Sequence, residues 1–448
     1  MTIAETLGEF LAGVSYAELP ALTHTHAKML IASTLASAAC GTQIASAGIV
    51  RALERERGGR ADACVWFDSG TALPLVGAAR VNAMMSDAAA SDDSDLRNIV
   101  HAGTPTIAAA FALAGRTGAS GAEILSAIVV GYEAAGRIAS AVNLGHGKRG
   151  FHGCVGAIFG AAAAAAHLLK LTPLQMAHTL ALSATSIGGL AAAAASSVAR
   201  EYHAGHATML GMEAALAAGR GYTSELGIFE IEHGFCAVYG ARDIHEITAG
   251  LGADWDIVTD MAIKLVPGGH PHHALAEAGA NASRLGKINP DDVAEISVSR
   301  PGLTQLSGPL HPADLIDMAH SPAYFTAAGV ADGRFGWEHA TLEKIKNPTI
   351  HALIDKVKVG PQPTHKPEAY RHGASVAITT YAGETFSSTV LVPKGAACLG
   401  IDWCDVDEKY RTLIPQAQVN ATALETSLGC IHEFEQCAQV ESLLQHLR

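Results

Sequence analysis

The sequence is poor in aromatic residues and has no excess of positive charge, and both absences restrict what the protein can be. Only 5% of its 448 residues are aromatic while 49% are hydrophobic, which indicates a core packed from small aliphatic side chains. The formal net charge of −13 argues against nucleic acid as a partner, because a phosphate backbone is bound by a basic surface. A local basic pocket can coexist with an acidic surface, so the charge is compatible with an anionic substrate.

The cysteines and the N-terminus also lack familiar signals. The eight cysteines are scattered and none belongs to a CxxC motif, which argues against a zinc ribbon or a thioredoxin-type site. Nothing at the N-terminus resembles a signal peptide, because Glu5 and Glu9 interrupt the opening helix. The alanine runs at 161–166 and 191–195 are short and weakly hydrophobic for membrane spans. We therefore expect a cytoplasmic protein without a membrane or nucleic-acid partner.

The length is typical of two domains, and the residue pattern changes along the chain. Residues 1–264 show apolar side chains at helical spacing, with breaks at glycine and proline. Residues 265–395 mix helices with strand-like segments, including a hairpin that turns at Ala382 and Gly383. Residues 396–448 are helical again and are expected to return to the first domain. The predicted fold class is mainly α, with a large all-α helical domain and a smaller α+β domain.

A glycine-rich polar segment is the first candidate for a ligand site. Residues 145–156, GHGKRGFHGCVG, contain His146, Lys148, Arg149 and His152 and precede an alanine-rich helix. Free backbone N–H groups and the helix dipole favour an anion at a helix start, which predicts one wall of an anion-binding site. The alternative is an ordinary solvated loop between helices. The GxGxxG spacing is not interpreted as a dinucleotide fingerprint, because no strand precedes it.

Two further runs offer metal ligands. The HPHH run at 270–273 supplies imidazoles, but it has no helical i, i+4 pair and no neighbouring acid. The acidic run at 91–95, SDDSD, offers oxygen ligands for a divalent cation, whereas the simpler interpretation is a solvated acidic loop. No metal site is predicted.

Six segments, in order and over nearly the whole chain, resemble those of the MmgE/PrpD family. They are VNAMMSDAAASDDSDLRNIVHAG, GFHGCVGAIFGAAAAAAHLLKL, REYHAGHATMLGMEAALAAGRGYTSE, IKLVPGGHPHHALAEA, HSPAYFTAAGVADGRF and VAITTYAGETFSSTVLVPKG. The family includes 2-methylcitrate dehydratase, cis-aconitate decarboxylase and iminodisuccinate epimerase. The resemblance implies its fold, a homodimer, and removal of a proton beside a carboxylate. No cofactor is expected, because a carboxylate substrate already carries the electron sink.

The family's catalytic residues can be carried over one by one. His101 matches the histidine after the acidic cluster, and His152 matches that of the GxH motif. Lys264 matches a lysine before a proline, His273 a histidine nearby, and Tyr324 the tyrosine of S-x-P-Y. The resemblance implies that His101 and His152 act as base and acid, in either order. Tyr324 is expected to donate a proton or a hydrogen bond, with a packing residue as the alternative.

A second group of residues is expected to bind the substrate. Cations and imidazoles hold the carboxylates and the developing enolate charge, and acids orient a histidine. The residues expected in these roles are Arg200, Lys264, Lys148, Arg149, His203, His270, His273, Asp92 and Asp93.

The chain departs from the family pattern at the proposed site. Ala90 stands where the family has the first acid of its DxDD-type cluster, and Arg200 stands where it has a lysine. Gly269 stands where some relatives have a histidine. Arginine keeps the charge and binds carboxylate in a bidentate way, but it cannot release a proton near neutral pH. These changes predict a divergent member with a different substrate or reaction.

The expected function is that of a cofactor-independent lyase of the dehydratase type, which eliminates water from a small hydroxylated di- or tricarboxylate. The first alternative is an epimerase or isomerase of an amino-polycarboxylate, and the second is a cis-aconitate-type decarboxylase. All three begin with the same proton abstraction. From another class, the chain could be an inactive binding protein that kept the fold.

Overall fold

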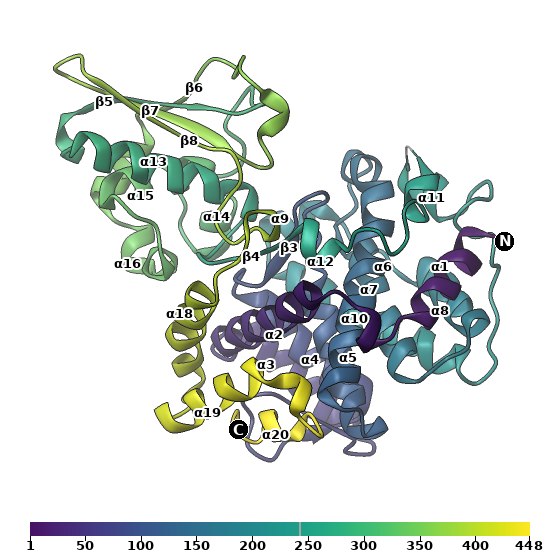
Figure 1. Cartoon of the computed structure of the whole chain (residues 1–448). Coiled ribbons are helices and arrows are strands. Elements are labelled where there is room, and N and C mark those ends of the chain that lie inside the picture. The colour runs from purple at the N-terminus through teal and green to yellow at the C-terminus, as the bar shows by residue number, and fades with distance from the viewer. Residues whose placement is uncertain (242) are drawn as a thin grey trace. The chain divides into compact units, whose positions relative to one another are not determined.

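The computed structural model describes residues 1–448 except Arg242, and it describes no side chains for residues 143–146. His146, which was predicted to lie in a ligand-binding loop, therefore falls outside the described side chains. The chain divides into two compact units (Figure 1). We call Met1–Ile263 with Gly400–Arg448 the helical unit, and Lys264–Leu399 the mixed unit.

The helical unit is built almost entirely from α-helices. Its longer helices are α1 (Ile3–Gly13), α2 (Ala21–Gly41), α3 (Ala45–Arg57), α4 (Leu75–Ala88), α5 (Gly103–Thr117), α6 (Gly121–Lys148), α7 (Cys154–Leu168), α8 (Pro173–Ser186), α10 (Ala199–Ala218), α18 (Trp403–Leu413) and α19 (Ala421–His432). Short helices are α9 (Ala191–Ser196), α11 (Phe235–Tyr239), α12 (Asp256–Thr259) and α20 (Glu441–Leu444). The last helices of the chain pack on α2, which lies near its beginning.

The centre of the helical unit is packed from alanine and glycine. Helix α7 contacts α6 and α10, and Ala161–Ala166 are completely buried. A Cβ atom on Gly131 of α6 would lie 2.6 Å from the backbone oxygen of Gly160 on α7. The small side chains therefore let the helix backbones approach closely. The apolar stretch Gly121–Val142 is long enough to cross a membrane, but 94% of its most apolar window is buried within the fold.

Two small antiparallel strand pairs lie among the helices of the helical unit. Strands β1 (Ala63–Cys64) and β2 (Ala72–Leu73) form one antiparallel pair. Strands β3 (Asp93–Asp95) and β4 (Met261–Ile263) form the other, with Asp93 opposite Ile263. The segment Ser91–Asp95 is completely or almost completely buried, so the prediction of a solvated acidic loop is wrong.

The mixed unit carries a four-stranded sheet in the order β6-β5-β7-β8. The strands are β5 (Val293–Ser299), β6 (Val357–Val359), β7 (Ala374–Thr380) and β8 (Thr385–Val390), and only β5 and β6 are parallel. The helices are α13 (His273–Gly286), α14 (Leu315–Ala319), α15 (Pro322–Asp332), α16 (Leu342–Ile345) and α17 (Pro348–Ile354). Helix α13 packs on β7 and β8 and contacts α15. The predicted fold class, mainly α with a smaller α+β part, is confirmed.

The late hairpin shows why the pattern of this unit could be predicted. Alternate residues of β7 are buried, from Ala374 to Thr380, and Ile378 lies opposite Phe386 of β8. The turn falls at 381–384, with Gly383 at φ +85°, a conformation that favours glycine. The predicted hairpin is confirmed.

The close packing of α2 on α4 predicts an unusual effect of adding one methyl group. A Cβ on Gly41 would overlap the backbone of Met85 on α4, which cannot shift cheaply. We expect Gly41→Ala to lower the free energy of unfolding by about 1–3 kcal/mol or more, although alanine is the better helix former. The measurement is thermal and denaturant unfolding monitored by circular dichroism.

The matched control is Gly48→Ala in α3, where no atom lies within 4 Å of the added Cβ. This variant should be up to about 1 kcal/mol more stable than the wild type, because it gains helix propensity without a clash. Equal stability of Gly41→Ala and the wild type would contradict the packing described here.

Candidate active site

His101 lies in the segment between β3 and α5, and a buried carboxylate holds its ring. Its Nδ1 lies 2.9 Å from Oδ2 of Asp92 and 2.8 Å from the backbone oxygen of Asp93. Both neighbours accept hydrogen bonds, so in the neutral ring the proton belongs on Nδ1 and the basic lone pair on Nε2. The His101 side chain is 19% exposed whereas that of Asp92 is completely buried. A carboxylate that fixes a partly exposed imidazole in this way orients it for proton transfer.

The start of α5 stabilises both acids of the cluster. The Thr104 hydroxyl donates to Oδ2 of Asp92 at 3.3 Å, and the backbone N–H of Gly103 donates to Oδ2 of Asp93 at 3.1 Å. The helix dipole adds to this stabilisation. A Cβ on Gly103 would lie 2.5 Å from Oδ1 of Asp93, so glycine is required here. These contacts give Asp93 a structural role at the helix start.

Two further cations hold the ends of the acidic segment. Lys409 of α18 is buried, and it donates to the Ser33 hydroxyl at 2.7 Å and to the backbone oxygen of Ser91. Arg97 contacts the carboxylates of Asp95, Asp256 and Asp260. Burial lowers the pKa of Arg97, but these acids outweigh it and raise the pKa overall.

Burial of Asp95 raises the pKa of its carboxyl group to about 6, even though Arg97 opposes the shift. The backbone of the segment is closed as well, because the N–H of Asp95 donates to the carbonyl of Val100 at 2.9 Å. The residue that follows, His101, is therefore attached to a tightly fixed loop.

Arg200 pairs with Asp87, an acid that the family resemblance does not indicate. Its Nε donates to Oδ2 of Asp87 at 2.9 Å, and its Nη2 donates to the backbone oxygens of Asp87 and, at 3.3 Å, of Ala88. Asp87 lies in the last turn of α4. It precedes by three residues Ala90, the position at which the family has the first acid of its cluster. Burial lowers the pKa of Arg200, but Asp87, Asp92 and Glu201 outweigh it, and the pKa is raised. Arg200 is thus neutralised, which does not fit its predicted role as a cation held ready for a substrate carboxylate.

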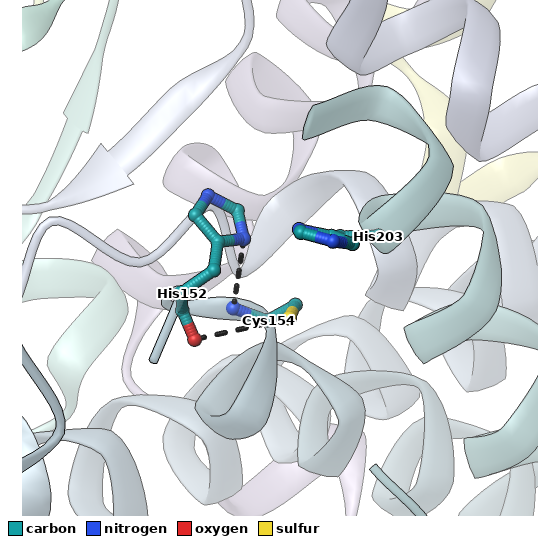
Figure 2. A group of neighbouring side chains, drawn as sticks. All are labelled: His152, Cys154 and His203. Atoms are coloured by element: carbon teal, nitrogen blue, oxygen red, sulfur yellow. Dashed lines mark hydrogen bonds between the residues drawn. The ribbon is translucent and has the colours of Figure 1, made fainter. Parts of the chain in front are cut away.

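His152, Cys154 and His203 form a second group of side chains (Figure 2). The imidazole centroids of His152 and His203 are 5.0 Å apart, and the backbone N–H of Cys154 donates to Nδ1 of His152 at 3.4 Å. His203 lies three residues after Arg200 on α10. A Cβ on Gly189 would lie 2.8 Å from Sγ of Cys154 and 3.2 Å from the His203 ring, so the group is closely covered.

Asp87 links the two groups electrostatically. Burial lowers the pKa of His203, and the charge of Asp87 partly opposes this shift. Burial raises the pKa of Cys154 to about 12, and Asp87 adds to the increase. The carboxylate oxygens of Asp87 and Asp92 and a ring nitrogen of His101 lie within 4.8 Å of one another. The structure therefore brings His101, Asp92, Arg200, His152 and His203 into one neighbourhood around Asp87.

The glycine-rich segment does not form the predicted anion-binding wall. Helix α6 continues to Lys148 and α7 begins at Cys154, so the connection is shorter than the predicted loop. Lys148 is exposed, and the exposed Arg149 donates to the backbone oxygens of Ala237 and Val238. Among the described residues, neither cation contacts the His152 group. Lys148 is the last residue of α6, and the guanidinium of Arg149 is bound to backbone carbonyls.

The remaining predicted residues belong to the mixed unit. Lys264, His270 and His273 are buried, and the rings of the two histidines are 4.6 Å apart. The hydroxyl of Tyr324 is buried and donates to the backbone oxygen of His339 at 2.8 Å, and burial raises its pKa. These contacts fit the packing alternative for Tyr324 better than its predicted role as a proton donor.

Two groups within the described part of the chain have the donor atoms of a metal site. His152, Cys154 and His203 form one, and Asp87, Asp92 and His101 form the other. In the second group, Asp87 already forms an ion pair with Arg200. In the first, the buried thiol would have to lose its proton to act as a ligand. The HPHH run at 270–273 does not appear among such groups in the residues described.

His101 is fixed by Asp92 and lies close to the Asp87–Arg200 pair, and this arrangement suits acid–base chemistry. The sequence model of the MmgE/PrpD N-terminal domain matches residues 5–247, and that of the MmgE/PrpD C-terminal domain matches residues 267–427. The chain belongs to the MmgE/PrpD family.

Among its relatives are enzymes named for one reaction. Cis-aconitate decarboxylase of Homo sapiens is 25% identical over 422 residues, which cover 92% of this chain and 87% of the relative. A cis-aconitate decarboxylase-like protein of Aspergillus oryzae is 26% identical over 401 residues, covering 82% and 81%. Cis-aconitate decarboxylase of Aspergillus terreus is 30% identical over 224 residues, covering 45% and 44%.

Burial of the Cys154 thiol predicts low chemical reactivity despite its two histidine neighbours. Its pKa of about 12 leaves almost no thiolate near neutral pH, and the thiolate is the nucleophile. In a time course with iodoacetamide followed by peptide mass spectrometry, Cys154 should be modified far more slowly than the exposed Cys398. Cys236 is the matched control, because it is also buried with a pKa of about 12. Modification of Cys154 as fast as Cys398 would show instead that the histidines activate it.

Proposed function

We propose that the protein is a cofactor-independent lyase that removes a proton beside a carboxylate of a small di- or tricarboxylate and then eliminates water. The observation that carries the proposal is the hydrogen bond between His101 and the buried carboxylate of Asp92. It leaves Nε2 of His101 as the base, and it stabilises the imidazolium that forms when this nitrogen takes the substrate proton.

His152 is the proposed acid. Elimination requires a proton donor for the departing hydroxide, and a partly buried imidazole beside another imidazole can supply one. Burial lowers the pKa of His203, so His203 is neutral when His152 carries its proton and the two rings do not repel each other as a pair of cations.

The Asp87–Arg200 pair has a positioning role in this proposal. It fixes the end of α4 beside the acidic segment without offering a labile proton. Carboxylate binding by Lys264, His270 and His273 stays a prediction, as does a homodimeric assembly.

Decarboxylation is the second candidate, and the names of the relatives favour it. Loss of CO2 leaves a carbanion that must be protonated, so His101 or His152 would act as the acid and no hydroxide would depart. Both reactions use the same two histidines, and they differ in which bond to carbon breaks.

The test is proton exchange in D2O followed by NMR, with 2-methylcitrate, citrate, cis-aconitate, iminodisuccinate and malate as candidates. With its substrate, the wild-type protein should place deuterium on the carbon beside a carboxylate. The product in the same spectrum names the branch as dehydration, decarboxylation or epimerisation. His101→Gln should slow the exchange by about 10²–10⁴-fold, and the exposed control His233→Ala should not. No exchange with any of these acids would contradict the proposal.

Replacement of Asp92 tests the orienting role directly. We expect Asp92→Asn to lower kcat by about 10²–10⁴-fold with little change in KM, because an amide no longer favours the Nδ1–H ring or stabilises the imidazolium. Asp402→Asn, at the exposed N-cap of α18, is the control and should keep kcat within about twofold. An Asp92→Asn variant with full activity and an unchanged circular dichroism spectrum would rule out this role.

A further inference from the structure

We propose that Arg300, with His272, His320 and His372, forms a carboxylate-binding site within the mixed unit. The existence of an anion site follows from the residues themselves. Its assignment to a small di- or tricarboxylate rests on the proposed function.

These side chains come from four separate segments. His272 ends the short 3-10 helix before α13, Arg300 follows β5, His320 caps the end of α14, and His372 precedes β7. Burial lowers the pKa of His272 to about 3, and Arg300, His320 and His372 add to this shift. All four groups are cationic or imidazole side chains, and no acid is among the groups that shift His272.

Two hydrogen bonds fix the cluster. The Arg300 guanidinium donates through Nη2 to the backbone oxygen of Pro271, which precedes His272. The backbone N–H of Gly269 donates to the carbonyl of Ala319, which precedes His320, at 3.0 Å. The His272 ring packs against Phe325, with centroids 5.5 Å apart. The cluster is thus held from several sides.

Arg300 differs from the other buried arginines because no carboxylate neutralises it. Within the described part of the chain it makes no ion pair, and its Nε is buried without a hydrogen-bond partner. Burial lowers its pKa with nothing to oppose the shift. In the helical unit, by contrast, Arg80 pairs with Glu54, Arg137 with Glu133 and Arg200 with Asp87. A partly buried cation without a counter-charge is costly, and an external anion would compensate it.

The donors around Arg300 suit a carboxylate. A guanidinium binds a carboxylate through two parallel hydrogen bonds, and one edge of Arg300 contains the unpartnered Nε. Nδ1 of His272 is also buried without a partner among the described residues, so the ring has a nitrogen left for a ligand. The start of α13 has no side-chain cap, which adds backbone N–H groups and the helix dipole nearby.

The proposal predicts a specific pattern of stability. Without a ligand, Arg300 is a cation without a counter-charge, so Arg300→Gln should be no less stable than the wild type in anion-free buffer. With a bound carboxylate the wild type should gain thermal stability, and Arg300→Gln should not gain it.

The experiment measures binding to the full-length protein by calorimetry and thermal unfolding. The probes are tricarballylate, an unreactive tricarboxylate, and inorganic sulfate. Arg300→Gln should weaken tricarballylate binding by about tenfold or more, because a charge-assisted hydrogen bond is lost. Arg300→Lys, which keeps the charge but not the fork, should fall between the two. Arg284→Gln, an exposed arginine of α13, is the matched control and should bind like the wild type.

Equal tricarballylate affinity in the wild type, Arg300→Gln and Arg300→Lys would overturn the site. Binding of sulfate but not tricarballylate through Arg300 would overturn the carboxylate assignment. If the D2O exchange fails with every acid but tricarballylate affinity still depends on Arg300, the proposed function falls and this site stands. If exchange occurs but tricarballylate affinity does not depend on Arg300, the proposed function stands and this site falls.

Discussion

The burial of the acidic segment Ser91–Asp95 is the constraint on which the candidate site depends. Three carboxylates, those of Asp92, Asp93 and Asp95, are buried inside the helical unit. Ionised carboxylates are costly to bury unless donors and cations surround them. Here the start of α5, Arg97 and Lys409 provide those groups. Because this arrangement fixes the segment, it also fixes His101, which follows it.

This constraint explains why distant parts of the chain belong to one unit. Lys409 belongs to α18, near the C-terminus, and it binds the backbone oxygen of Ser91, which is 318 positions earlier in the sequence. Strand β4, which ends the segment Met1–Ile263 of the helical unit, pairs with β3. The C-terminal helices therefore contribute a charge as well as apolar area, and their loss would leave the acidic segment poorly compensated.

The features that sequence reasoning predicted correctly depend on local patterns. Alternation in β7 predicted the hairpin, and alanine-rich helical spacing predicted the packed helices. The acidic run was misjudged because its partners are remote, as Lys409 shows. Asp87 was missed because its partner Arg200 is 113 positions away, and no short motif signals such a pair. Tyr324 matched a motif, yet its hydroxyl is bound inside its own unit.

Two of the three departures from the family pattern, Ala90 and Arg200, lie near Asp87. Ala90 lacks the acid, but Asp87 supplies one a turn earlier, and the guanidinium of Arg200 reaches both its carboxylate and the backbone oxygens at the end of α4. The consequence is that Arg200 is neutralised. Among the described residues, Arg300 is a cation without a counter-charge, at a position that no family motif indicates.

Asp92 holds His101 with its proton on Nδ1, and the tautomer of that ring can be measured directly. NMR of the full chain with isotope-labelled histidine distinguishes the two neutral tautomers, and comparison with His101→Gln assigns the signal. We expect the Nδ1–H form in the wild type and its loss in Asp92→Asn. A wild-type His101 that carries its proton on Nε2 would contradict this role of Asp92, because Nε2 could then not act as the base.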